Sequence, residues 1–117
     1  MDNAKDDKYY LNKLIEDTGF IIKHTKDISK KAFTEDEILQ DSMMFRMIQI
    51  SANVLKLSED FRNNHNEIPW YAIRGLRNRI VHDYGNVDLT IIYDTISKDI
   101  PEVHNYLTGL AKLEHSD

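Results

Sequence analysis

Apolar residues recur at intervals of three and four along most of the chain, which is the spacing of one face of an α-helix. This pattern predicts four main helices, over about 7–29, 34–61, 69–82 and 88–110, with short helical segments beside them. No convincing run of alternating apolar and polar residues indicates a β-strand. The predicted fold class is therefore all-α, a bundle of helices.

Several residues mark where these helices begin or bend. Thr34 is followed by Glu37 in a capping-box pattern, so the second helix is expected to open there. Pro69 suits the first turn of the third helix, because its missing N–H needs no partner at that position. Asp88 can cap the fourth helix, and Pro101 should kink or interrupt it.

The second predicted helix carries more apolar residues than one packing face needs. One stripe consists of Ile38, Phe45, Ile48, Ala52 and Leu55. A second set widens it: Leu39, Met43, Ile50, Val54 and Leu57. Such width predicts contact with more than one neighbour, and it favours a homodimer in which this helix contributes to the interface.

Length and composition limit the possible classes of protein. With 117 residues the chain is expected to form one domain over 1–117, with a frayed tail from about 112. It has no cysteine, which excludes a thiolate nucleophile and fits a reducing compartment. The first residues lack the features of a leader, and no apolar run approaches the ~20 residues of a membrane span. A cytoplasmic protein without membrane contact is expected.

The strongest chemical signal is the segment 74–84, which holds three arginines, an amide, an imidazole and a phenol. At about 100° per residue, Arg74, Asn78 and His82 form one polar stripe, with Arg77 on its shoulder. The opposite flank is apolar and can be buried, through Ile73, Leu76 and Ile80. Arginine forks match phosphate oxygens, and histidine can take and give a proton near neutral pH. Together they suggest chemistry on a phosphodiester.

Other readings of the same residues stay open. Basic stripes are often merely solvated, and a histidine near a helix end often satisfies only the last carbonyl groups. Arg74 could hold phosphate or pair with an acid on a neighbouring helix, whereas Arg79 points away from the stripe and is expected to be solvated or salt-bridged. The net charge of −5 opposes nonspecific nucleic-acid binding, yet residues 62–82 hold four arginines and one acid. The remaining histidines are scattered, so no metal site is expected: His24, His65, His104 and His115.

The motif Arg77-x4-His82-x-Tyr84 resembles the R-x4-H-x-Y form of the R-x4-6-H motif of the HEPN superfamily. That form belongs to the toxin half of HEPN/MNT toxin–antitoxin pairs. The flanking segments are similar as well, and the resemblance runs from about residue 57 to residue 103. It implies a HEPN-like helical bundle, metal-independent RNA cleavage without a cofactor, and an active site at a homodimer interface.

The resemblance also implies roles for individual residues. Arg77 and His82 would be catalytic, and Arg74 and Asn78 would support binding of the substrate. The partner would be an MNT-type nucleotidyltransferase antitoxin of the type VII class, which in some pairs transfers AMP to the tyrosine of the motif, here Tyr84. The alternative is a catalytically silent HEPN module that binds a nucleotide, RNA or a protein. Tyr84 could also serve only to close the bundle with its ring.

Overall fold

The computed structural model describes residues 6–81 and 88–115 of the chain, and every regular element within those ranges is helical. This confirms the predicted all-α fold class. The elements are α1 (Asp7–Thr25), α2 (Lys30–Thr34), α3 (Glu37–Val54), α4 (Glu59–Asn64), α5 (Trp70–Arg74), α6 (Leu76–Val81), α7 (Leu89–Asp94), the π-helical turn η1 (Thr95–Asp99) and α8 (Ile100–His115). None of the described helices combines the length and apolar character that crossing a bilayer requires.

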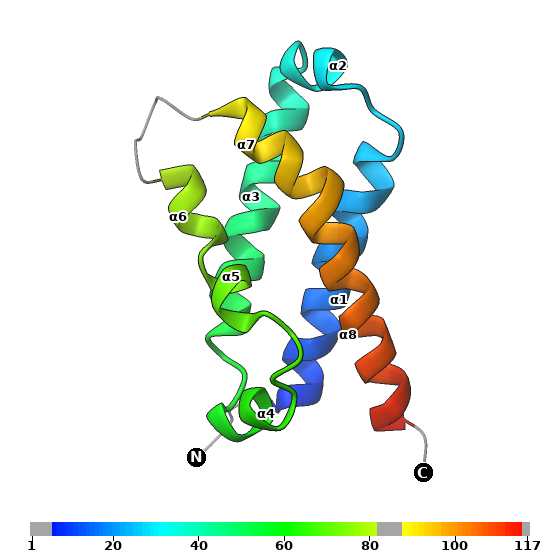
Figure 1. Cartoon of the computed structure of the whole chain (residues 1–117), viewed down its shortest axis with the longest axis vertical. Helices are drawn as coiled ribbons and strands as arrows, with labels where there is room; N and C mark the ends of the chain where they lie inside the picture. The colour runs from blue at the N-terminus through cyan, green and yellow to red at the C-terminus, as the bar shows by residue number, and fades with distance from the viewer. Residues whose placement is uncertain (1–5, 82–87, 116–117) are drawn as a thin grey trace.

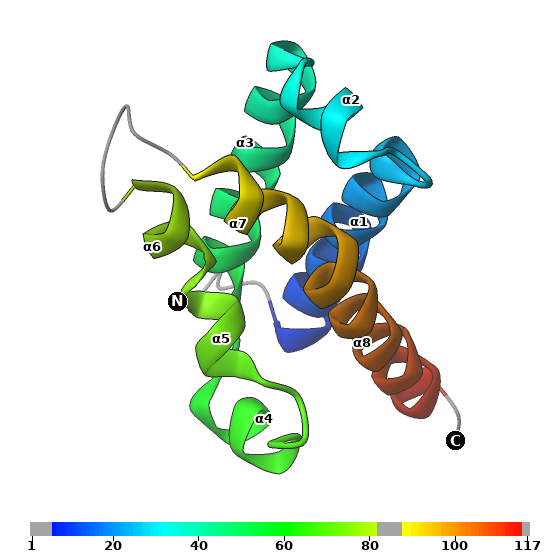
Figure 2. The same cartoon turned by 45° about the horizontal axis from the view of Figure 1, so that its top comes forward.

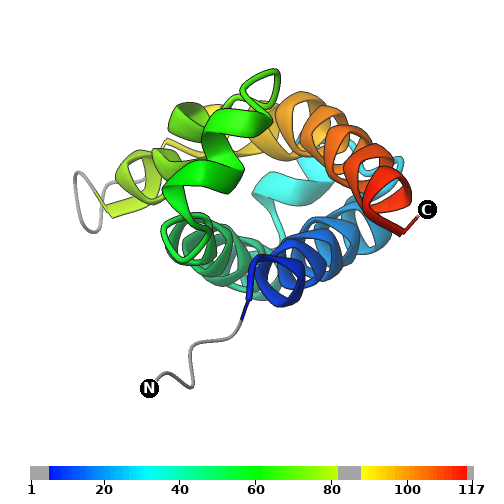
Figure 3. The same ribbon diagram turned by 90° about the horizontal axis from the view of Figure 1, so that it is seen from below.

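The long helix α1 packs against both α3 and α8, and α5 and α6 cover another side of α3 (Figure 1). Seen from below, the helices surround a common interior (Figure 3). Apolar side chains from α1, α3, η1 and α8 fill that interior without solvent exposure above 1 %, among them Leu14, Ile21, Met47, Ile50, Ile96 and Leu107. The site segment therefore rests on α3, which is itself fixed by the core.

The first predicted boundaries were placed wrongly. The first helix ends at Thr25, where Asp27 adopts a left-handed backbone with φ 61°, and Ser29 then caps the short helix α2. Thr34 is the last residue of α2, and its hydroxyl donates to the carbonyl of Lys30 rather than capping α3. The cap of α3 is Asp36, whose carboxylate accepts from the Leu39 N–H at 3.0 Å. The capping-box prediction at Thr34 was therefore wrong by two residues.

Of the predicted features later in the chain, some are confirmed and others are wrong. The second helix ends at Val54 and not near 61, because the chain turns and Ser58 caps the separate helix α4. Asp88 does cap α7, accepting from the N–H groups of Thr90 and Ile91 as predicted. The sequence predicted a kink or interruption at Pro101. Instead the π-helical turn η1 joins α7 to α8, and the helix continues without a break (Figure 2). A π-turn before Pro101 accommodates the missing N–H and the ring.

The two apolar sets on α3 differ in burial. Met43, Ile50 and Val54 are fully buried, so the second set forms the core side of the helix. Much of the first stripe faces outward: Ile38 is 84 % exposed, Phe45 58 % and Leu55 52 %, whereas Ile48 is partly buried against the core. The described residues of the chain leave these apolar side chains uncovered.

A partly buried polar pair, Thr18 and His104, joins α1 and α8. The Thr18 hydroxyl donates to the Leu14 carbonyl at 2.9 Å and lies 2.8 Å from Nδ1 of His104. The hydroxyl has only one proton, so when it donates to the Leu14 carbonyl, Nδ1 of His104 is the donor in the contact between the two side chains. The ring sits against Gly19, where an added Cβ would lie 3.3 Å from its Cε1 atom. Burial lowers the pKa of His104 below its ordinary value of 6.5.

This lowered pKa predicts acid sensitivity. Between pH 6.5 and the lower folded-state pKa, His104 is protonated in the unfolded chain and neutral in the folded one, so unfolding takes up a proton. The free energy of unfolding should be fully maintained above pH 6.5 and fall below it, by at most about 1.4 kcal/mol per pH unit. Urea denaturation at several pH values measures this. His104→Gln should flatten the profile in that window, whereas the exposed control His24→Gln should not; identical profiles for all three proteins would contradict the prediction.

Candidate active site

The site segment is two short helices joined at Gly75, not the continuous helix that the spacing predicted. The Gly75 N–H donates to the Tyr71 carbonyl at 3.0 Å, and the Asn78 N–H donates to the Gly75 carbonyl at 3.0 Å. The second of these spans three residues instead of four, so the helix tightens at this point. The buried hydroxyl of Ser51 on α3 donates to the Arg74 carbonyl, which fixes the joint against the core.

Burial of the apolar flank sets the direction of the polar one. Ile73 is 2 % exposed, Leu76 3 % and Ile80 7 %, as the sequence pattern predicted. The side chains of Arg74, Arg77 and Asn78 are left on the exposed side of the same two helices. All three side chains therefore stay exposed despite the kink at Gly75.

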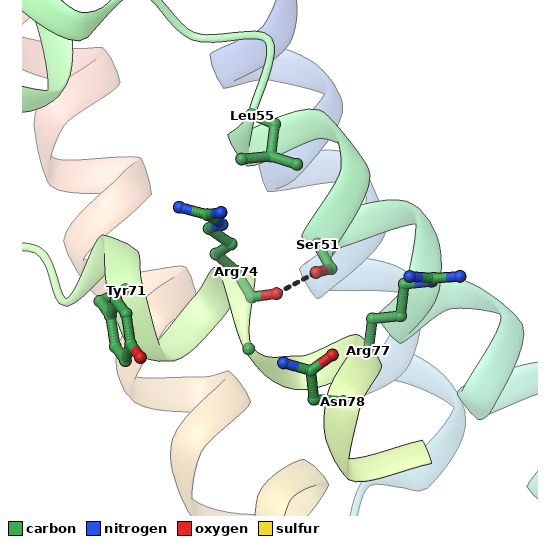
Figure 4. A pocket seen from close by; sticks show the side chains of 7 residues that line it. Ser51, Leu55, Tyr71, Arg74, Arg77 and Asn78 are labelled. Atoms are coloured by element: carbon green, nitrogen blue, oxygen red, sulfur yellow. Dashed lines mark hydrogen bonds between the residues drawn. The ribbon is translucent and has the colours of Figure 1, made fainter. Parts of the chain in front are cut away.

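These three side chains line one open pocket of about 360 Å³ between α3 and the α5–α6 joint (Figure 4). It is lined by Ser51, Leu55, Tyr71, Arg74, Gly75, Arg77 and Asn78. In the close view the Arg74 side chain extends between Tyr71 and Leu55, while that of Arg77 extends to the other side of Ser51. Arg74, Arg77 and Asn78, three of the five predicted site residues, are thus brought together; His82 and Tyr84 lie outside the described residues.

The positive charge in this pocket comes from two arginines. Among the residues that the structure describes, no ion pair joins Arg74 or Arg77 to an acid. Arg79 differs: its Nη1 donates to Asp99 at 3.1 Å and to the Thr95 hydroxyl at 2.8 Å. Of the two expectations for Arg79, solvated or salt-bridged, the second is confirmed. Two guanidinium groups at one opening form a site for an anion with several oxygens.

Sequence reasoning missed two other side chains at this opening. Tyr71 is 87 % exposed although it is a large aromatic residue, and Leu55 is half exposed at the rim. Tyr71 follows Trp70 directly, and nothing in the residue types alone shows which ring is buried. The pocket therefore offers two cations, an amide and an aromatic ring, which is a donor set suited to a phosphate and an adjoining base.

Comparison with known proteins places the chain in a family. The model of the family described as Ribonuclease HepT-like matches residues 14–110. No solved structure gives a significant match to the fold.

Individual relatives agree with the family match. A protein of Caldanaerobacter subterraneus, named as a presumed RNase, is 31 % identical over 105 residues, which cover 90 % of this chain and 94 % of that protein. A protein of Thermococcus cleftensis, named as a probable ribonuclease HepT, is 29 % identical over 90 % of this chain and 96 % of its own length. A longer protein of Methanocaldococcus jannaschii, named as both a gamma-glutamylcyclotransferase and a presumed RNase, is 33 % identical over 85 % of this chain and 45 % of its own length. The chain belongs to the HepT-like ribonuclease family of the HEPN superfamily.

Proposed function

We propose that this chain is a metal-independent endoribonuclease and the toxin of a HEPN/MNT toxin–antitoxin pair. The observation that carries the proposal is the pocket lined by Arg74, Arg77 and Asn78, whose two arginines have no acidic partner among the described residues, in a member of the HepT-like family. Support for RNA as the substrate comes from the names of the relatives, which designate ribonucleases.

The proposed reaction is attack of a ribose 2′-hydroxyl on the adjacent phosphorus. A bond forms between the 2′-oxygen and phosphorus, and the bond from phosphorus to the 5′-oxygen breaks. His82 takes the proton of the 2′-hydroxyl, or gives a proton to the leaving 5′-oxygen when it starts protonated. Arg77 binds the phosphoryl oxygens as their charge rises, and Arg74 and Asn78 hold the substrate in place. The products are a 2′,3′-cyclic phosphate and a 5′-hydroxyl.

The experiment that tests this function uses the purified chain and a labelled RNA. Cleavage should proceed equally with and without a chelator, and the product ends should be the cyclic phosphate and the hydroxyl. Expression of the chain alone should stop growth, and coexpression of a cognate nucleotidyltransferase should restore it. Activity that vanishes with the chelator and returns with a divalent ion would overturn the mechanism.

In a homodimer, the second copy of His82 would supply the second proton-transfer group that RNA cleavage needs. One histidine cannot be base and acid in the same step, whereas two copies of the stripe supply both roles. Support comes from the outward apolar stripe on α3, which includes Phe45 and reaches Leu55 at the rim of the pocket. Pairing across this face would place a second copy beside the pocket.

This pairing predicts the effect of a charge in the apolar stripe. Phe45→Glu should make the protein monomeric at micromolar concentration, because the carboxylate would lose its hydration in the interface. Cleavage should fall with dimerisation, although Phe45 is 58 % exposed and does not line the pocket. Analytical ultracentrifugation measures the oligomeric state. The matched control is Leu113→Glu on α8, where Leu113 is 71 % exposed; it should leave the dimer and activity intact. A wild-type monomer, or a fully active monomeric Phe45→Glu, would contradict the shared site.

Covalent control by the antitoxin is proposed at Tyr84. AMP added to this hydroxyl would place phosphate charge beside Arg77 and His82, where it would compete with the RNA backbone. A phenol ordinarily has a pKa near 10 and is a poor base beside an imidazole, so the role assigned to Tyr84 is regulatory.

Tyr84→Phe tests that assignment. The variant should keep most of its ribonuclease activity and escape covalent inhibition, since it has no hydroxyl to modify. Intact mass spectrometry after coexpression with the nucleotidyltransferase should show AMP-sized additions on the wild type and on the control Tyr106→Phe, and none on Tyr84→Phe. A fully inhibited complex with unmodified Tyr84 would leave occlusion as the mechanism of inhibition.

A further inference from the structure

A second cavity, of about 460 Å³, continues the candidate active site toward α4. It shares Tyr71 and Arg74 with the first pocket, so the two form one groove along α5. The other residues that line the second cavity include Glu59, Arg62 and Asn66. We refer to this second cavity as the α4–α5 groove.

Tyr71 stands at the junction of the two cavities, and its exposure is not explained by the fold. The neighbouring Trp70 side chain, in contrast, links α5 to the end of α4. Its indole N–H donates to the carbonyls of Arg62, at 3.1 Å, and of His65, at 3.0 Å. Tyr71 is 87 % exposed and makes no side-chain hydrogen bond or ring contact with the residues that the structure describes. An aromatic ring that faces solvent is a surface on which an unpaired base can stack.

The charges along the groove fit a polynucleotide strand. Arg74 and Tyr71 line both cavities, and Arg62 lines the α4–α5 groove. The Nε atom of Arg62 is shielded from solvent and has no hydrogen-bond partner among the described residues. Glu59 is the one acid among the described residues that line either cavity, and with Asn63 and Asn66 it offers groups that can pair with base edges. The groove thus combines two arginines with side chains able to contact bases.

We propose that the α4–α5 groove is a subsite for single-stranded RNA, in which one base stacks on Tyr71 and the flanking phosphates are held by Arg74 and Arg62. The subsite rests on the proposed ribonuclease function, since the strand would continue into the pocket of Arg77. Single strands are favoured because stacking on Tyr71 needs an unpaired base, whereas the bases of an A-form duplex are stacked on one another. The groove would select substrate by strandedness, apart from the chemistry of cleavage.

The chain contains a built-in reporter for this subsite. Trp70 is its single tryptophan, and it lines the α4–α5 groove beside Tyr71. Intrinsic fluorescence therefore reports occupancy of the groove without any label and without turnover. The titration uses the His82→Ala variant, which would keep the RNA intact, with a short mixed-sequence RNA strand and with the blunt duplex of the same sequence.

The expected result is a saturable change in Trp70 emission with the single strand and little change with the duplex. Tyr71→Ala should weaken binding about 5- to 150-fold, the range for loss of one base stack, whereas Tyr71→Phe should bind like the wild type. Arg62→Gln should reduce the dependence of affinity on salt by about one phosphate contact. The matched control is Tyr106→Ala, an exposed tyrosine on α8, which lines neither cavity. In the active chain, Tyr71→Ala should raise KM and leave kcat nearly unchanged.

The outcomes separate the subsite from the proposed activity. RNA cleavage with no Trp70 response and an unchanged KM in Tyr71→Ala would overturn the subsite and leave the ribonuclease standing. A Trp70 response to single strands that Tyr71→Ala abolishes, in a protein that cleaves no RNA, would support the subsite while the catalytic proposal fails. Equal binding of the duplex would overturn the claim of strand selection. Circular dichroism should show unchanged folding for Tyr71→Ala, since the ring contributes little to packing.

Discussion

Replacement of His82 by alanine is expected to abolish RNA cleavage and toxicity while the protein stays folded. A positioned acid or base contributes about 10²- to 10⁴-fold to the rate, and in a dimer both copies are lost at once. Arg77→Ala should cost about 10²- to 10³-fold, because it removes a preorganised donor for the developing phosphoryl charge. Single-turnover cleavage of a labelled RNA measures both rates.

The chain offers a matched control for Arg77. Arg79 is two residues away on the same helix α6, but it is bound to Asp99 and Thr95 and does not line the pocket. Arg79→Ala should therefore keep near-normal cleavage and lose at most about 1 kcal/mol of stability. The double variant of Arg77 and His82 should be little worse than the slower single variant, since groups that act as a unit are not additive. Activity in Arg77→Ala equal to that of Arg79→Ala would remove Arg77 from the mechanism.

The largest expected effect on stability follows from Arg46→Ala. Nη1 of Arg46 donates to Oδ1 of Asp17 at 2.7 Å, and the guanidinium lies 3.8 Å from the centre of the Phe20 ring. The Asp17 side chain is 1 % exposed, and its other oxygen has no partner among the described residues. Removal of Arg46 would leave a carboxylate buried between α1 and α3 without compensation, which typically costs about 3–5 kcal/mol.

Urea denaturation at one fixed protein concentration measures this loss, with a lower midpoint and an unchanged slope. Lys13→Ala serves as the control, because Lys13 pairs with Glu16 at 3.4 Å on the exposed side of α1 and should contribute less than about 1 kcal/mol. Removal of both partners, as Asp17→Asn with Arg46→Met, should recover much of the loss, because no charge stays buried. A cost for Arg46→Ala no larger than that for Lys13→Ala would show that the pair does not hold the two helices together.

The sequence predicted the features that depend on neighbours along the chain. Asp88 caps α7 as expected, because a cap needs only a side-chain oxygen within reach of the next N–H groups. The apolar flank of the site segment is buried for a similar reason, since Ile73, Leu76 and Ile80 recur with the helical period. Residue spacing alone therefore assigns the polar residues of that segment to the opposite, exposed side.

Tertiary contacts decided between local signals of equal strength. Thr34 and Asp36 are both good caps, but Phe33 is fully buried and Gln40 donates to the carbonyls of Phe33 and Thr34. These contacts hold Thr34 at the end of α2 and leave Asp36 to begin α3. Likewise both apolar sets of α3 have the helical period, and only packing against α1, α5 and α6 determines which one is buried.

The sequence by itself determined the all-α class, the family motif and the cationic face of the site segment, because each depends on residue type and spacing. Only the tertiary structure decided that Arg79 is bound to Asp99, whereas Arg74 and Arg77 meet no acid among the described residues. It also decided that Trp70 is buried and Tyr71 exposed. The physical reason is that periodicity describes which residues share a face, whereas burial and ion pairing depend on what the other helices place opposite that face.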